Sequence, residues 1–205
     1  MRRGYDAASL RYDEAFGAGT KYRPLLAELR RRLPRAGSVL DLGCGSGEPV
    51  ARSLAAAGHR VTGVDFSTVQ LRRARQAVPD GEFVRADAAA VTFEPASFDA
   101  VVCCYLLIHL PLAEQPPLLR RIAAWLRPGS CLAAVTGHTA VTGIEEDWLG
   151  SGAPMWWSHP DAATSRAWIT QAGLTVEREE FVPEGDAGHV LFWARRPSLR
   201  SGARS

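Results

Sequence analysis

Lysine is almost absent from this 205-residue chain, because Lys21 is the only one and arginine supplies the rest of the positive charge. The formal net charge is +2, but four arginines lie in the last eleven residues, so residues 1–194 sum to −2. A slightly acidic body does not complement a polyphosphate backbone. The charge pattern therefore excludes a nucleic-acid partner.

Long apolar runs and paired cysteines are also missing. No stretch approaches the roughly 18 apolar residues that cross a bilayer, and the first residues resemble no secretory signal, so we expect a soluble, cytoplasmic protein without a membrane partner. The cysteines form no C-x-x-C pair and are expected to be small buried hydrophobes in a reducing compartment; they are Cys44, Cys103, Cys104 and Cys131. We expect no metal site.

Strand-like and helix-like segments alternate through the first two thirds of the chain. Strands are expected at residues 38–42, 60–64, 82–85, 98–104 and 131–136, and helices at residues 22–33, 50–57, 67–78 and 116–126. This order predicts an α/β fold, a doubly wound and mostly parallel sheet with helices on both faces. The length fits one domain with decorations, acting as a monomer or homodimer.

Both ends of the chain depart from this alternation. Residues 1–36 are expected to form a helical arm with a flexible hinge at 17–19, preceding a main domain at 37–196 and a disordered tail at 197–205. Residues 137–159 show neither helical nor strand periodicity and predict a long functional loop. A helix at 160–172 and an antiparallel strand pair at 174–181 and 189–195 should follow.

A glycine-rich turn between the first strand and the next helix is the main functional signal. The strand ends at Asp41, and Gly43, Gly45 and Gly47 follow at alternate positions. Glycine tolerates the dihedrals of a sharp turn and lets backbone N–H groups approach a ligand closely. The spacing is G-x-G-x-G rather than the dinucleotide fingerprint G-x-G-x-x-G, so a nucleotide-type cofactor is indicated without its identity.

Carboxylates end the first three predicted strands. Ligands of open parallel sheets bind beyond the carboxyl ends of the strands, where Asp41, Asp65 and Asp87 fall. Asp65, 22 residues after Gly43, could accept hydrogen bonds from both ribose hydroxyls of an adenosine. Asp87 could accept from an adenine amino group, with the Ala88 N–H meeting a ring nitrogen.

With these residues in place, the chain resembles the class I S-adenosylmethionine-dependent methyltransferases of small-molecule type. Four segments resemble that family's first four motifs, in order: Val39-Leu-Asp-Leu-Gly-Cys-Gly-Ser-Gly47, Val64-Asp-Phe-Ser67, Arg85-Ala-Asp-Ala88 and Phe98–Pro111. The resemblance implies a Rossmann-like seven-stranded sheet whose last strand is antiparallel. It also implies S-adenosylmethionine as cofactor and S-adenosylhomocysteine as product. The cofactor contacts it implies are Tyr5, Tyr12, Asp41, Gly43, Gly45, Asp65, Phe66, Asp87, Ala88 and Tyr105.

The sequence indicates less about the residues that would contact the methyl acceptor. A sulfonium methyl is already activated, so a base helps only when the acceptor keeps its proton until attack. His109, soon after the fourth strand, is the first candidate base, and His159 is the second. His138, Trp156 and Trp157 in the long loop are candidate acceptor contacts, because aromatic faces suit a planar or apolar molecule.

The absence of motifs that mark other methyltransferase subclasses narrows the possible classes of acceptor. The chain lacks the N-P-P-[YF] and Pro-Cys signatures of DNA methylation and the paired-glutamate loop of protein arginine methylation. A small-molecule acceptor in secondary metabolism, methylated on O, N, S or C, is the resulting hypothesis. Two alternatives remain: a cofactor-binding protein that catalyses a non-methylating reaction such as a cyclisation, and an NAD-dependent oxidoreductase. The missing Tyr-x-x-x-Lys pair counts against the oxidoreductase.

Overall fold

The computed structural model describes residues 2–16, 21–184 and 187–198. The predicted hinge at 17–19 and most of the predicted tail, residues 199–205, lie outside them. The helices are α1 (Arg2–Phe16), α2 (Arg23–Arg32), α3 (Val50–Ala56), α4 (Thr68–Ala77), α5 (Gln115–Trp125) and α6 (Ala162–Gln171), with short 3-10 turns η1 (Leu107–His109), η2 (Leu112–Glu114) and η3 (Trp148–Gly150). The strands are β1 (Ser38–Leu42), β2 (Arg60–Asp65), β3 (Glu82–Arg85), β4 (Phe98–Cys104), β5 (Leu126–Gly137), β6 (Val141–Glu145), β7 (Met155–His159), β8 (Thr175–Glu184) and β9 (Ala187–Arg195).

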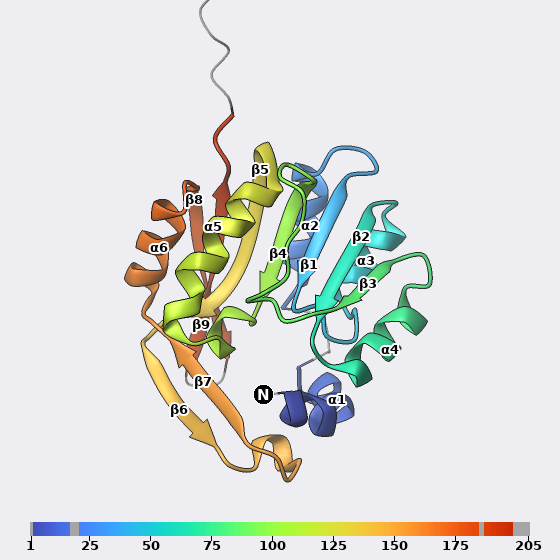
Figure 1. Ribbon diagram of the computed structural model, residues 1–205, viewed down its shortest axis with the longest axis vertical. Coiled ribbons are helices and arrows are strands. Elements are labelled where there is room, and N and C mark those ends of the chain that lie inside the picture. Colours follow the sequence, from blue (N-terminus) through green and yellow to red (C-terminus); the bar gives the residue numbers. More distant parts are fainter. Residues whose placement is uncertain (1, 17–20, 185–186, 199–205) are drawn as a thin grey trace, which may run out of the picture.

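A seven-stranded sheet forms the centre of the molecule (Figure 1), in the order β3-β2-β1-β4-β5-β9-β8. Strands β1 to β5 pair in parallel, whereas β9 runs antiparallel to both β5 and β8. The order of the strands reverses at β1, which pairs with β2 on one side and with β4 on the other. The predicted fold, with its antiparallel last strand, is confirmed.

Alternate residues of the strands feed two separate cores. Val39, Val102 and Trp193 face the side covered by α2, α3 and α4, whereas Leu40 and Val101 face the side covered by α5 and α6. Burial on both faces explains why the central strands read as nearly continuous apolar runs. The sheet is thus a rigid frame whose strand ends hold the polar residues.

Helix starts follow the local chemistry of the sequence. Ser67 caps α4 by accepting a hydrogen bond from the Gln70 N–H at 3.1 Å, and Asp161 caps α6 by accepting from Thr164 at 2.8 Å. Both caps are residue types that favour the first position before a helix. The four cysteines are unpaired. In the described part of the chain, no helix has the length and apolarity needed to traverse a bilayer.

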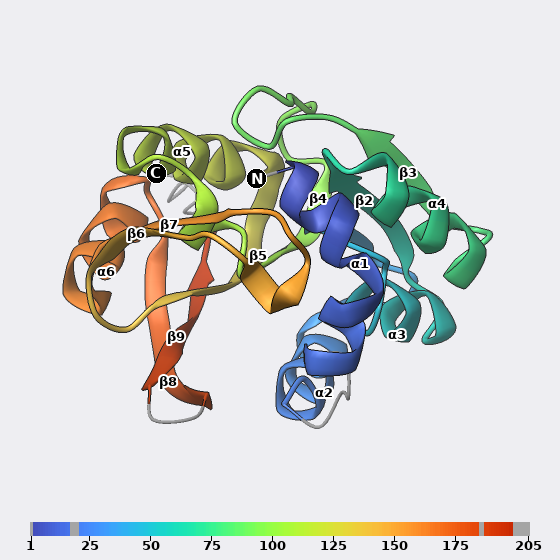
Figure 2. The same ribbon diagram turned by 90° about the horizontal axis from the view of Figure 1, so that it is seen from below.

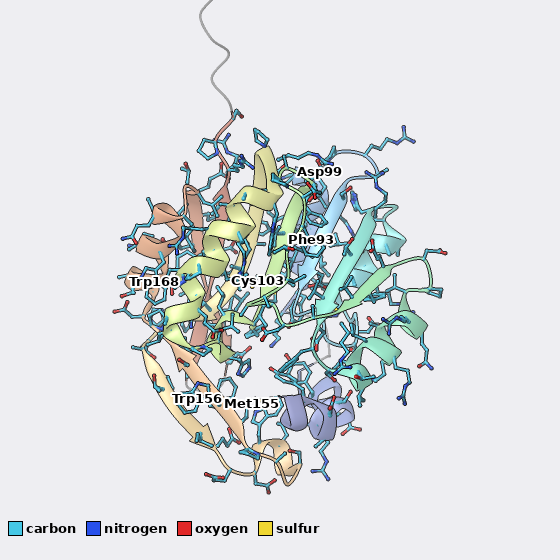
Figure 3. The ribbon with its side chains drawn as sticks, in the orientation of Figure 1. Phe93, Asp99, Cys103, Met155, Trp156 and Trp168 are labelled. Atoms are coloured by element: carbon cyan, nitrogen blue, oxygen red, sulfur yellow. The ribbon has the colours of Figure 1, made fainter. Side chains whose placement is uncertain are left out.

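Residues 137–159 do not form an irregular loop, so the expectation that they lack regular structure is wrong, whereas a functional role for them stays a prediction. β6 and β7 form an antiparallel hairpin, with Val141 opposite His159 and Glu145 opposite Met155. Most of β6 is exposed, so it lacks the apolar alternation that marks a half-buried strand. Figure 1 and the view from below in Figure 2 place this hairpin and α1 at the same end of the sheet. Figure 3 shows Met155 of the hairpin beside α1, where it packs with Ala8 and Trp148.

Gly137, at the end of β5, is required by close packing. A Cβ atom there would lie 1.7 Å from Nδ1 of His159. Gly137→Ala should lower the free energy of unfolding by about 1–3 kcal/mol, because the overpacked ring has to move. Gly143→Ala in β6 is the matched control, since its Cβ would meet no heavy atom within 4 Å. Urea unfolding of both variants measures the difference, and equal stabilities would contradict this packing.

Candidate functional site

The glycine turn after β1 adopts the backbone that its sequence predicts. Gly43, Gly45 and Gly47 have φ of 79°, 54° and 80°, values that other residues rarely adopt. The N–H groups of Gly43 and Cys44 both donate to the carbonyl of Val64, at 2.8 and 3.0 Å, and so tie the turn to β2. A Cβ at Gly45 would meet no heavy atom within 4 Å, which leaves open space above the turn.

Asp65 joins the end of β2 to the same turn. Its Oδ2 accepts a hydrogen bond from the Gly45 N–H at 3.0 Å, and its Oδ1 accepts from the Ser67 N–H at 2.8 Å. Burial raises the pKa of Asp65, although these backbone hydrogen bonds oppose the shift. A carboxylate has about four lone-pair positions, so both oxygens can still accept from a ligand.

Three hollows that share lining residues lie at this end of the sheet. The glycine pocket is lined by residues that include Tyr5, Tyr12, Asp41, Gly43, Gly45, Asp65, Gln70, Tyr105 and His109. The outer groove lies beyond β2 and β3 and is lined by residues that include Gly43, Asp65, Phe66, Asp87, Ala88 and His109. The aromatic pocket is lined by Tyr5, Tyr12, Lys21, Tyr105, Ile108, His109, Trp148, Trp157, Glu184 and His189.

Four side chains belong to both the glycine pocket and the aromatic pocket: Tyr5, Tyr12, Tyr105 and His109. They come from α1, from the segment after β4 and from η1, which are far apart in the sequence. Tyr105 has a φ of 60°, unusual for a residue with a side chain. These four residues are therefore the wall across which ligands in the two pockets would meet.

A hydrogen-bonded chain holds that wall together. Nδ1 of His109 lies 2.8 Å from the carbonyl oxygen of Trp156, and Nε2 lies 2.7 Å from the hydroxyl oxygen of Tyr5. A carbonyl can only accept, so Nδ1 carries the proton and Nε2 accepts from Tyr5. Burial lowers the pKa of His109 to about 4, which keeps the ring neutral. The chain, here called the His109 clasp, connects α1, η1 and β7.

Aromatic rings make most of the aromatic pocket. The ring of Trp148 lies 5.2 Å from that of Tyr5 and 5.8 Å from that of Tyr12, and the ring of Trp157 lies 4.7 Å from that of His109. Trp148 and Trp157 come from η3 and β7, so the β6–β7 hairpin supplies one side of this pocket and α1 the other. Such walls suit a flat or apolar molecule.

The structure brings twelve of the predicted residues together, His109 among them, and leaves three apart. The cofactor candidates all line the glycine pocket or the outer groove, and Trp157 lines the aromatic pocket. The ring of His138 meets that of Phe181 edge to face, with 5.0 Å between centroids, and Trp156 is 36% exposed. His159 is buried against Gly137, with its ring 6.4 Å from that of His189. Roles for these three residues and a base role for His109 stay predictions.

Several pocket residues escaped the sequence reasoning. Lys21, Glu184 and His189 meet in the aromatic pocket although they lie up to 168 positions apart. Trp148, in η3, is buried there as well. Lys21 is noticeable in the sequence as the sole lysine of the chain, but its neighbouring residues indicate no role for it. Within the described residues, no cluster of three or more His, Cys, Asp or Glu side chains suits a metal ion.

Comparison with known proteins identifies the family. Residues 39–129 match the family described as "Methyltransferase domain". The chain is 33% identical over 211 residues to the trans-aconitate 2-methyltransferase of Methylobacterium nodulans, covering 89% of this chain and 76% of that protein. It is 33% identical over 153 residues to the 27-O-demethylrifamycin SV methyltransferase of Amycolatopsis mediterranei, covering 64% of this chain but only 56% of that protein.

Solved structures agree. An S-adenosylmethionine-dependent methyltransferase of Mesorhizobium loti is 25% identical with a TM-score of 0.69, covering 87% of this chain and 99% of that one. The [4+2]-cyclase SpnF superposes with a TM-score of 0.73 at 17% identity, covering 97% and 96%, which shows likeness of fold alone. The chain therefore belongs to the class I S-adenosylmethionine-dependent methyltransferase family.

The carboxyl group of Asp41, at the end of β1, titrates near neutral pH and lines the glycine pocket. Its side chain is buried, and burial together with the nearby Asp65 raises the pKa of Asp41 to about 7. A raised folded-state pKa means that the folded chain holds the proton more tightly than the unfolded chain. The corresponding stability is complete below the unfolded pKa of about 3.9 and is lost as the pH rises through about 7.

Asp41→Asn should therefore become more stable relative to the wild type as the pH rises from 4 to 7, with the difference levelling off above 7. The slope should approach about 1.4 kcal/mol per pH unit within that window. Urea unfolding at several pH values measures it. A difference that does not vary with pH would show that Asp41 titrates as an ordinary carboxyl group.

Proposed function

We propose that this protein transfers a methyl group from S-adenosylmethionine to a small-molecule acceptor. The observation that carries the proposal is the wall of four side chains shared by the glycine pocket and the aromatic pocket. A cofactor in the first pocket and an acceptor in the second would touch the same residues, which is the arrangement that direct transfer between two bound molecules needs.

The described residues fit this cofactor. The open space above Gly45 and the positive φ of Gly43 let backbone approach the ligand. Asp65 would accept from the ribose hydroxyls, while Asp87, Ala88 and Phe66 in the outer groove would surround the adenine. Asp41 and Tyr105 would lie toward the methionine end. When bound, S-adenosylmethionine supplies a sulfonium whose methyl group is already electrophilic.

The residues of the chain then have three tasks. The strand ends fix one reactant and the aromatic pocket orients the other, and such alignment can supply about 7–11 kcal/mol of the barrier. The His109 clasp holds α1 and the β6–β7 hairpin together over the shared wall, which excludes water from the transfer point. Because His109 is neutral, the clasp places no charged imidazole beside the bound acceptor.

The acceptor class rests on the aromatic pocket and the relatives. Tyr5, Tyr12, Trp148 and Trp157 offer ring faces for a flat or apolar body. The names of the two relatives specify small molecules, trans-aconitate and 27-O-demethylrifamycin SV. A role in secondary metabolism is part of this proposal.

Turnover tests the proposal. The protein is incubated with S-adenosylmethionine and a panel of phenols, amines, thiols and carboxylates, and S-adenosylhomocysteine is measured. Acceptor-dependent product is expected. Cofactor binding with no turnover across the panel would favour non-methylating chemistry, and affinity for NAD with none for S-adenosylmethionine would refute the proposal.

Asp65→Ala tests the cofactor site directly. Loss of the carboxylate should weaken S-adenosylhomocysteine binding by about 1–3 kcal/mol, the usual cost of removing a hydrogen bond to a charged group. Calorimetric titration measures this change. Asp80→Ala is the matched control, because Asp80 lies in the turn before β3 and lines none of the three hollows. Unchanged affinity in the Asp65 variant would refute the ribose contact.

A further inference from the structure

The carboxylate of Glu184 and the imidazole of His189 both line the aromatic pocket, and neither lines the glycine pocket. Glu184 is the last residue of β8, and His189 follows in the paired strand β9. Nδ1 of His189 is buried and lies 3.3 Å from Oε2 of Glu184. The His189 side chain as a whole is 17% exposed, so other atoms of the ring are accessible although Nδ1 is not. Nδ1 makes no hydrogen bond of ordinary geometry to the described residues, so its contact with Glu184 is an ion pair that forms when the ring is protonated.

Glu184 is held by two other donors. Nζ of Lys21 lies 2.7 Å from Oε1, and the Tyr105 hydroxyl donates to the same oxygen at 2.8 Å. Oε2 is thus left to face His189. Burial alone would raise the pKa of Glu184, but the donors around it outweigh burial and lower that pKa to about 2. The carboxylate is therefore charged at neutral pH, and it favours the His189 tautomer that carries its proton on Nδ1.

The other histidines near the site lack this arrangement. Both nitrogens of His109 are engaged in the clasp. His159 packs behind His189 and does not line the pocket. In the described part of the chain, His189 is the histidine lining the aromatic pocket that lies beside a carboxylate and makes no side-chain hydrogen bond of ordinary geometry through Nδ1.

Resting on the proposed methyl transfer, we infer that His189 is the general base for the acceptor, that Glu184 positions it, and that the acceptor is an aromatic hydroxyl. A base is useful only if the nucleophile keeps its proton until attack, which a phenol does and a carboxylate does not. The ring walls of the pocket suit the flat body of a phenol. This assignment differs from the prediction that His109 or His159 is the base.

The step balances in charge and atoms. The hydroxyl proton moves to Nε2 of His189 while an oxygen lone pair forms the new bond to the methyl carbon. The carbon–sulfur bond breaks and both its electrons stay on sulfur, which becomes a neutral thioether. The positive charge then rests on the His189 imidazolium beside the Glu184 carboxylate. The titratable groups around this ring are Glu184, Tyr105, Lys21 and His159.

Phenols of graded acidity test the inference. His189→Gln should lower kcat about 10²–10⁴-fold for 4-methylphenol, which is neutral at pH 8.5, and far less for 4-nitrophenol, which is already ionised there. Glu184→Gln should show the same trend with a smaller loss. His59→Gln is the matched control, because His59 precedes β2 and lines neither the glycine pocket, the outer groove nor the aromatic pocket. Equal losses for both phenols, or no loss, would overturn the base assignment.

A second measurement needs no turnover. In the complex with S-adenosylhomocysteine and 4-nitrophenol, the wild type should show phenolate absorbance at a lower pH than free 4-nitrophenol, because His189 takes the proton. His189→Gln should abolish that shift while S-adenosylhomocysteine still binds. A shift retained in the variant, or a wild type that methylates carboxylates or amines but no phenol, would refute this inference alone. Failure of the wild type to bind S-adenosylhomocysteine would refute the proposed function instead.

Discussion

The hydrogen bond between the Asp65 carboxylate and the Gly45 N–H is the constraint on which the site depends. It joins the ends of β1 and β2, whose register is set by the sheet, to a turn whose positive φ values favour glycine. The two N–H bonds from Gly43 and Cys44 to Val64 reinforce the same junction. A ligand in the glycine pocket is thereby positioned by backbone held on a buried frame. Such support costs no side-chain reorganisation on binding.

Beside this turn, the His109 clasp ties α1 and the β6–β7 hairpin to η1. It depends on burial, because a buried imidazole without a charged partner stays neutral and can accept from Tyr5 while donating to Trp156. Neither α1 nor the β6–β7 hairpin belongs to the seven-stranded sheet. They contact each other through Ala8, Trp148 and Met155. The proposed acceptor pocket is thus lined by α1 and the β6–β7 hairpin together with residues of β8, β9 and the segment after β4.

This division explains what could be predicted from the sequence. The glycine turn, Asp65 and Asp87 follow from local rules, because glycine spacing and strand ends are visible within a few residues. The sheet followed from alternating apolar segments. The β6–β7 hairpin was missed, since β6 is exposed on both faces and carries no alternation. Glu184 and His189 could not be placed, because their proximity to Tyr105 and Lys21 arises only from long-range packing.

In the proposed function, the reacting methyl group lies at the wall shared by the glycine pocket and the aromatic pocket. A crystal structure of the complex with S-adenosylhomocysteine tests that placement most directly. We expect the ribose hydroxyls within hydrogen-bond distance of Asp65 and the sulfur atom facing Tyr5, Tyr105 and His109. A sulfur atom directed away from the aromatic pocket, or a ribose that makes no contact with Asp65, would contradict it.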